Sequence, residues 1–191
     1  KKVTEKLSLV PISTYNKTKM ITERVLKSYE SDIRLHCIRP ATVCGFSPRM
    51  RLDVSVNMLT FQALKFKSMT VFGGSQIRPN IHIQDLTNVY KHFILNPDLD
   101  CGFYNAGFEN LKIIEIAKKI SKIIPSKILI KKNIDLRSYR QNSDKLLSTG
   151  FVQKFSVDDA IKEIKEKYLT KKLIESSKCY TVKWMKKINL K

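Results

Sequence analysis

The sequence contains no apolar run that approaches the roughly 20 residues needed to cross a membrane. Hydrophobic residues nevertheless make up 42% of the 191 positions and recur in periodic segments. This composition predicts a soluble globular protein that has no membrane partner. No internal repeat is present, which argues against a solenoid or propeller.

Patterns typical of metal sites and disulfide frameworks are also absent. The four cysteines are widely separated and form no Cys-x-x-Cys pair: Cys37, Cys44, Cys101 and Cys179. The three histidines lack zinc-type spacing: His36, His82 and His92. We therefore expect no metal site, and we expect the cysteines to be buried free thiols in a reducing cytoplasm.

Acidic residues are scarce. The sequence has only 17 of them, against 36 lysines and arginines, so its net charge is +19. Such an excess suggests nucleic-acid binding, since clustered cations release counterions from phosphates. The lysines are spread from Lys17 to Lys187, however, and no basic groove interleaved with aromatic residues accompanies them. Nucleic acid is not an expected partner.

The hydrophobic periodicity predicts alternating strands and helices, which is typical of an α/β fold. Helices are predicted over residues 13–29, 53–67, 86–96, 113–124, 144–148 and 156–168. Strands are predicted over residues 32–39, 69–72, 78–83, 102–106 and 127–130. Residues 1–12 and 41–48 read as loops, and residues 172–191 are basic with little pattern.

Particular residues mark the ends of these predicted helices. Ser13 is a candidate N-cap, and Ser156 with Asp159 has the form of a capping box. Pro97 ends the helix that precedes it. No Gly-x-x-Gly-x-x-Gly is present, so the chain has no phosphate-binding helix N-terminus of the dinucleotide-binding kind.

Tyr15 and Lys19 are four residues apart at the start of the first predicted helix. That spacing places both side chains on one helix face. An ammonium beside a phenol favours the deprotonated oxygen, so Tyr15 could move protons. The same spacing also occurs by chance on solvated helix faces, and the pair alone does not decide between the two readings.

Three segments occur in an order that resembles the extended short-chain dehydrogenase/reductase family, and within it the NAD-dependent nucleotide-sugar epimerases and dehydratases such as UDP-glucose 4-epimerase. They are Pro11-x-Ser13-x-Tyr15-x-x-x-Lys19, Ile38-Arg39-Pro40-Ala41-Thr42-Val43-Cys44-Gly45, and Val71-Phe72-Gly73-Gly74-Ser75-Gln76-Ile77-Arg78-Pro79-Asn80-Ile81-His82-Ile83-Gln84-Asp85. The resemblance implies a Rossmann-type fold with a small α/β substrate-binding subdomain. It also implies NAD as cofactor.

The resemblance assigns roles to residues that match the family's motifs. Tyr15 is implied as the catalytic acid/base, and Lys19 as the residue that holds the nicotinamide ribose and assists Tyr15. Pro40 is implied as a cofactor contact. Thr42 lies beside the sugar, and Asn57 matches a position that holds the sugar or its diphosphate.

The remaining implied contacts concern the nucleotide. Arg78 matches an arginine that binds the diphosphate, a task suited to a guanidinium. Asp135 matches a carboxylate on the nucleoside ribose, and Arg137 or Arg140 adds a phosphate contact. Val71 and Phe72 resemble the strand that packs on the base, although core packing explains them equally well. The implied partner is a nucleotide sugar, with a UDP-hexose preferred.

The departures from the family pattern are equally informative. The glycine-rich NAD loop and the third catalytic residue, a serine or threonine, are expected upstream of residue 1, so we expect the C-terminal half of such an enzyme. Residues 1–168 would be the remainder of the epimerase/dehydratase domain, and 169–191 a basic extension. Cys44 stands where the family usually has tyrosine.

Two further expectations concern assembly. By resemblance, the helices at 13–29 and 53–67 form a four-helix homodimer interface. The alternative function is a non-catalytic nucleotide-sugar-binding or assembly module that pairs with a separate Rossmann chain.

Overall fold

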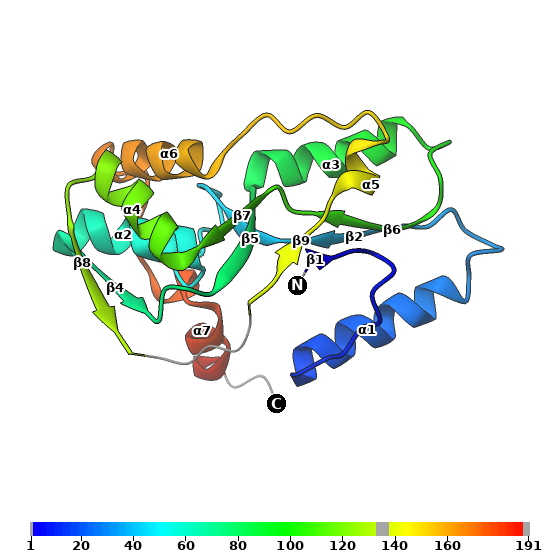
Figure 1. Cartoon of the computed structure of the whole chain (residues 1–191), viewed down its shortest axis with the longest axis horizontal. Coiled ribbons are helices and arrows are strands. Elements are labelled where there is room, and N and C mark those ends of the chain that lie inside the picture. Colours follow the sequence, from blue (N-terminus) through cyan, green and yellow to red (C-terminus); the bar gives the residue numbers. More distant parts are fainter. Residues whose placement is uncertain (1, 133–137, 189–191) are drawn as a thin grey trace.

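The computed structural model describes residues 2–132 and 138–188, and Figure 1 shows two adjoining α/β parts with one outlying helix. The helices are α1 (Thr14–Lys27), α2 (Ser55–Phe66), α3 (Ile83–Leu95), α4 (Ile113–Ile123), α5 (Asp144–Leu147), α6 (Val157–Leu169), the 3-10 turn η1 (Ser177–Cys179) and α7 (Thr181–Lys187). The strands are β1 (Lys2–Val3), β2 (His36–Pro40), β3 (Thr42–Cys44), β4 (Ser68–Phe72), β5 (Ile77–His82), β6 (Gly102–Ala106), β7 (Glu109–Lys112), β8 (Lys127–Lys131) and β9 (Arg140–Gln141).

The strands pair mostly in parallel, as the alternation of strands and helices predicts. β2 pairs with β6, β3 with β5, β4 with β8, and β1 with β9, all in parallel. Only β5 and β7 form an antiparallel pair among the described residues. Because β3 follows directly after β2, Pro40 and Thr42 lie at the junction between two neighbouring pairs.

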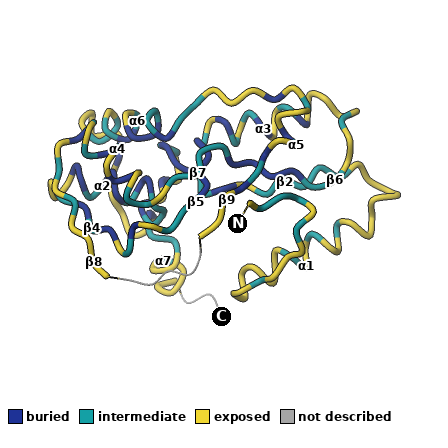
Figure 2. The backbone as a smooth tube through the Cα atoms, viewed as in Figure 1, coloured by how far each residue is buried: buried dark blue, intermediate teal, exposed yellow. Residues whose placement is uncertain are grey.

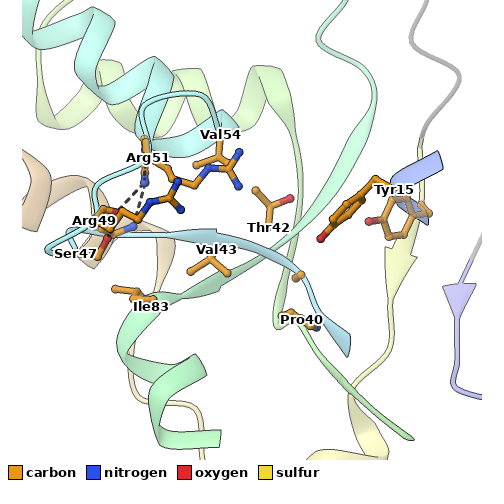
Figure 3. Close-up of a pocket in the computed structure, with 13 residues that line it drawn as sticks. Tyr15, Pro40, Thr42, Val43, Ser47, Arg49, Arg51, Val54 and Ile83 are labelled. Atoms are coloured by element: carbon orange, nitrogen blue, oxygen red, sulfur yellow. Dashed lines mark hydrogen bonds between the residues drawn. The ribbon is translucent and has the colours of Figure 1, made fainter. Parts of the chain in front are cut away.

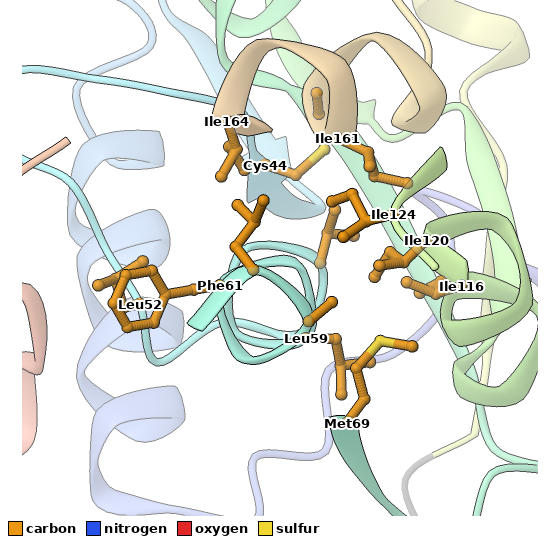
Figure 4. Close-up of a cluster of buried hydrophobic side chains, with 14 of the residues drawn as sticks. Cys44, Leu52, Leu59, Phe61, Met69, Ile116, Ile120, Ile124, Ile161 and Ile164 are labelled. Atoms are coloured by element: carbon orange, nitrogen blue, oxygen red, sulfur yellow. The ribbon is translucent and has the colours of Figure 1, made fainter. Parts of the chain in front are cut away.

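The first hydrophobic core surrounds α2, which packs against α4, α6 and β4 (Figures 1 and 4). Leu59 and Met69 face Ile116, Ile120 and Ile124 there (Figure 4). The second core lies between β2, β6, α3 and α5 and is built around Tyr104 and Phe93. The α/β fold predicted from the sequence is confirmed.

Several predicted details are confirmed by side-chain contacts. The Ser13 side chain accepts a hydrogen bond from the Asn16 amide (3.2 Å) and caps α1. Ser156 and Asp159 form the expected capping box at α6. Asp85 lies in the first turn of α3, buried, and accepts bonds from the amides of Lys154 and Phe155. Asp85 therefore has a structural role, in which it joins the start of α3 to the segment that precedes α6.

Other predictions were wrong. Residues 41–48 are not all loop, because the β-branched pair Thr42-Val43 extends as β3 along β5. Residues 1–12 include β1, which pairs with β9. The strand expected from residue 32 begins only at His36, after a turn. Cys101 is exposed, whereas Cys44 and Cys179 are buried and all four thiols are free.

The two helices expected to form one dimer interface differ sharply in burial. Most of α2 is buried by α4 and α6, so its apolar face is used within the chain. No residue of α1 is buried, and Ile21, Val25 and Tyr29 are each about half exposed. Figure 2 shows α1 as a largely exposed helix set apart from α2. The expected homodimer stays a prediction, and within this chain the apolar face of α2 packs internally.

Among the described residues, no helix has the length and apolarity that a bilayer crossing requires. Within the same ranges, no cluster of histidine, cysteine or acidic side chains is arranged to hold a metal ion.

Candidate functional site

A cavity of about 490 Å³ opens at the junction of α1, β2, β3 and the N-terminus of α2. Figure 3 shows Tyr15 on one side and Arg49 and Arg51 on the opposite side, with Thr42 between them and Pro40 below. The full lining is Tyr15, Pro40, Ala41, Thr42, Val43, Gly45, Ser47, Arg49, Arg51, Val54, Asn57, Ile83 and Tyr139. Four residues expected at the site from the sequence are thus brought together: Tyr15, Pro40, Thr42 and Asn57.

Tyr15 and Lys19 are neighbours on the exposed face of α1, as the spacing predicted. The Lys19 ammonium nitrogen lies 5.5 Å from the centre of the Tyr15 ring. Tyr15 is 68% exposed and lines the cavity, whereas Lys19 lies beside it outside the lining. Lys19 has no ion-pair partner in the described part of the chain.

A two-pronged ion pair attaches α1 to the strand that leads into the cavity. The Arg39 guanidinium donates through Nε and Nη2 to the two Glu23 carboxylate oxygens, at 2.9 and 2.6 Å. Arg39 immediately precedes Pro40, so this pair sets the position of the Tyr15 helix relative to the cavity floor.

Asn57 holds the loop that forms the cavity wall opposite Tyr15. Its Oδ1 accepts from the Gly45 amide (3.0 Å), and its Nδ2 donates to the Arg51 carbonyl (3.0 Å). The side chain is almost fully buried. The structure therefore shows a positioning contact for Asn57, and its expected contact with substrate stays a prediction.

Gly45 makes the turn out of β3 possible. Its φ of +106° lies in the left-handed region that favours glycine. An added Cβ would lie 3.0 Å from both His82 Nε2 and Ile83 Cγ2. The loop therefore needs glycine at this position for two independent reasons.

Cys44, at the end of β3, is a packing residue. It is 1% exposed, and burial, followed by the charges of Glu109 and Glu163, raises its pKa to about 12. Its Sγ donates to the Ile81 carbonyl. A neutral thiol in this setting is not a nucleophile.

Arg78 lies in a second hollow of about 350 Å³ that adjoins the first through Thr42 and Val54. Phe72 also lines this hollow and is about half exposed, whereas Val71 is fully buried in the first core. Arg78 donates from Nη1 to the Ile77 carbonyl (3.1 Å). Two adjoining hollows suit an extended ligand with chemically different ends.

Asp135 and Arg137 fall outside the described residues, and their expected contacts with the nucleotide stay predictions. Arg49 and Arg51 were not expected at the site. The sequence signal that could have revealed them is a pair of arginines two residues apart, in a loop between a strand and a helix that both reach the cavity.

Comparison with known proteins decides the family. The model of the NAD-dependent epimerase/dehydratase family matches residues 1–107. The chain belongs to this family. The resemblance identified from the Tyr15 to Asp85 motifs is therefore confirmed.

The chain covers only part of the length of the individual proteins to which it is similar. It is 28% identical over 124 residues to an uncharacterized UDP-glucose epimerase, YtcB, of Bacillus subtilis, covering 64% of this chain and 39% of that protein. The UDP-glucuronic acid 4-epimerase of Bacillus cereus, solved with NAD, is similar with a TM-score of 0.75 and 26% identity, covering 88% of this chain and 57% of that one.

A dehydratase shares the same fold. The dTDP-glucose 4,6-dehydratase of Bacillus anthracis, solved with NAD, has a TM-score of 0.74 and 18% identity, covering 90% of this chain and 57% of that one. The chain thus spans a little over half of these solved structures, and the α/β fold corresponds to part of the Rossmann-type family fold.

Proposed function

We propose that this chain forms the acid/base and substrate-binding part of an NAD-dependent nucleotide-sugar epimerase or dehydratase. The observation that carries the proposal is the placement of Tyr15, with Lys19 beside it, at the mouth of the cavity formed by Pro40 and Thr42. The similar epimerases and dehydratase solved with NAD give independent support.

The residues present fit NAD at the Tyr15 side of the cavity. Lys19, which lies beside Tyr15, would hold a ribose hydroxyl, and Pro40 would offer an apolar surface to the nicotinamide ring. NAD, when bound, supplies reversible hydride transfer. The Tyr15 oxygen, as the phenolate, would take the proton of a sugar hydroxyl. Loss of that proton, together with the hydride that NAD would accept, would leave a transient keto-sugar, and Tyr15 would later return the proton.

Substrate contacts follow from the same arrangement. Thr42 lies where the two hollows meet and would contact the sugar. Arg78, in the second hollow, would bind the diphosphate of a UDP-hexose, since a planar guanidinium matches paired phosphate oxygens. Asn57 would act by holding the loop and by contacting the sugar.

The isolated chain is proposed to have no turnover, because its sequence holds no glycine-rich dinucleotide loop. We place the protein in the cytoplasm on the basis of its four free thiols. A homodimer is also proposed, with α1 as the contributing helix because its apolar residues are exposed. Sedimentation of the wild type and of a Val25→Glu variant tests the dimer, with Ile94→Glu on α3 as control.

An assay with UDP-hexoses and NAD tests the catalytic proposal, using both the 191-residue chain and the same chain with any residues that its gene encodes upstream. In the active form, Tyr15→Phe should lower turnover by about 100- to 10,000-fold. Tyr29→Phe, the same change at another exposed tyrosine beside α1, should leave turnover unchanged. Retained activity in Tyr15→Phe would remove Tyr15 from the acid/base role and favour a non-catalytic binding module.

A further inference from the structure

The loop of residues 45–54 carries two arginines into the main cavity. Arg49 and Arg51 both line it, together with Tyr15. No acidic side chain belongs to the described lining. The cavity is therefore electropositive on the side opposite Tyr15, which suits a ligand with an anionic group.

The segment 173–187 packs directly behind this loop. Leu173 and Cys179 are buried in the first core, although the surrounding sequence is basic and weakly patterned. The Leu52 amide donates to the Cys179 carbonyl (2.9 Å). The segment is thus an integral part of the structure beside the cavity.

Asp53 joins the segment to one of the two arginines. Its Oδ1 accepts from Arg51 Nε (2.9 Å), and its Oδ2 accepts from the Thr181 amide (2.9 Å). A guanidinium has five N–H donors, so the bond to Asp53 leaves four available to a ligand. Asp53 therefore orients Arg51 without using up its capacity to bind an oxyanion.

Trp184 holds the other arginine. The Arg49 guanidinium carbon lies 5.6 Å from the centre of the Trp184 ring, within the range of a cation–π contact. Arg49 has no carboxylate partner in the part of the chain that the structure describes. Stacking on an aromatic ring orients a guanidinium while leaving its charge uncompensated.

We propose that Arg49 and Arg51 form an oxyanion-binding subsite for the substrate, and that the segment 173–187 positions both guanidiniums through Trp184 and through the bond between Thr181 and Asp53. The inference rests on the proposed function, since it assumes a nucleotide sugar in the cavity. The bound group is a carboxylate on the sugar or a phosphate of the diphosphate. Trp184 and Asp53 are positioning residues.

Trp184 is the only tryptophan in the chain, so its fluorescence reports on this subsite. The 191-residue chain is titrated with UMP, UDP, UDP-glucose and UDP-glucuronate, with affinities measured by calorimetry. If the group is a sugar carboxylate, UDP-glucuronate should bind about 10-fold or more tightly than UDP-glucose. If it is a diphosphate oxygen, UDP and both sugars should bind equally, each about 10-fold more tightly than UMP.

Variants then test the residues. Arg49→Met or Arg51→Met should abolish whichever 10-fold difference the wild type shows. Trp184→Leu should weaken binding of the favoured ligand about 2- to 5-fold, and Trp184→Phe should restore it, because an aromatic face is retained. Lys122→Met, which removes a charge on α4 away from the cavity, serves as the matched control.

Unchanged affinity ratios in both arginine variants would overturn the subsite, and wild-type affinity in Trp184→Leu would overturn the positioning role. A substitution with a merely structural effect would lower thermal stability without changing the ratio of affinities for the different ligands. Failure of the proposed function can be distinguished from failure of the subsite. In that case ligand binding would still depend on the arginines, but turnover would not depend on Tyr15. Failure of all four ligands to bind would overturn both proposals.

Discussion

Glu23 and Arg39 form a two-pronged ion pair in which each side chain is only 17% exposed. Arg39 also lies over the Phe103 ring, with 4.6 Å between the guanidinium carbon and the ring centre. Since α1 has no buried residue, this pair is a principal attachment of the Tyr15 helix to β2. The position of Tyr15, the proposed acid/base, therefore depends on an interaction two helical turns away.

Replacing Glu23 with glutamine should cost about 1 to 3 kcal/mol of unfolding free energy, because Arg39 keeps its charge but loses its carboxylate partner. Urea denaturation measures the loss, and hydrogen exchange should show faster opening of α1. A double-mutant cycle with Arg39→Met isolates the pair. A coupling energy below about 0.5 kcal/mol would show that the pair does not hold the helix.

Asp85→Ala should destabilise the protein by about 2 to 4 kcal/mol. The buried carboxylate accepts bonds from the amides of Lys154 and Phe155, and alanine would leave both amides without a partner. Asp98→Ala is the matched control, because the Asp98 side chain is 98% exposed and pairs only with Arg34. Equal midpoints of chemical denaturation for the two variants would contradict the structural role of Asp85.

Gly45→Ala should cost about 2 to 4 kcal/mol, since it combines a left-handed backbone with a Cβ forced against His82 and Ile83. Gly150→Ala separates these effects, because Gly150 has φ of +86° and nothing within 4 Å of an added Cβ. Its cost should be about 1 kcal/mol. Thermal unfolding of both variants measures the two losses of stability. A smaller loss for Gly45→Ala than for Gly150→Ala would refute the proposed clash of the added Cβ.

Acid should release the segment 173–187 from the core. Burial raises the pKa of Asp53, but the hydrogen bond and charge of Arg51 and the bond from the Thr181 amide outweigh it and hold that pKa below its usual range. Hydrogen bonds from Lys65 and Tyr180 likewise lower the pKa of Glu175. Both carboxylates stabilise the attachment above about pH 4, and this is lost as pH falls through the lowered folded-state pKa values.

Trp184 fluorescence followed from pH 7 to pH 2 measures this release. The unfolding free energy of Asp53→Asn should change less over the acid range than that of the wild type, because one titrating group has been removed. Asp98→Asn provides the control at an exposed aspartate. Identical acid profiles for Asp53→Asn and the wild type would contradict the prediction.

The sequence predicted the fold class and the placement of Tyr15 beside Lys19 because these depend on local patterns. The Tyr15-Lys19 spacing, the Ser13 cap and the proline that follows α3 each act within a few residues. The short strands were missed because β1 and β9 contain two residues each and pair across the length of the chain. A two-residue strand has no period to detect.

The arginine side of the cavity was missed for a different reason. Arg49 and Arg51 enter the site through the turn at Gly45, and Trp184 reaches Arg49 through tertiary packing alone. The basic composition of residues 172–191 also concealed Leu173 and Cys179 as core residues. Burial of isolated apolar residues in a charged segment leaves no periodic signal.

The bond between Asp53 and Thr181 spans 128 residues and has a consequence for synthesis of the protein. At 5 to 20 residues per second, a ribosome needs roughly 6 to 26 seconds to make the intervening chain. Throughout that time the face of α2 that Cys179 and Leu173 later cover has no complete packing. The core and the rim of the cavity therefore cannot be completed until residues 173–181 have been made.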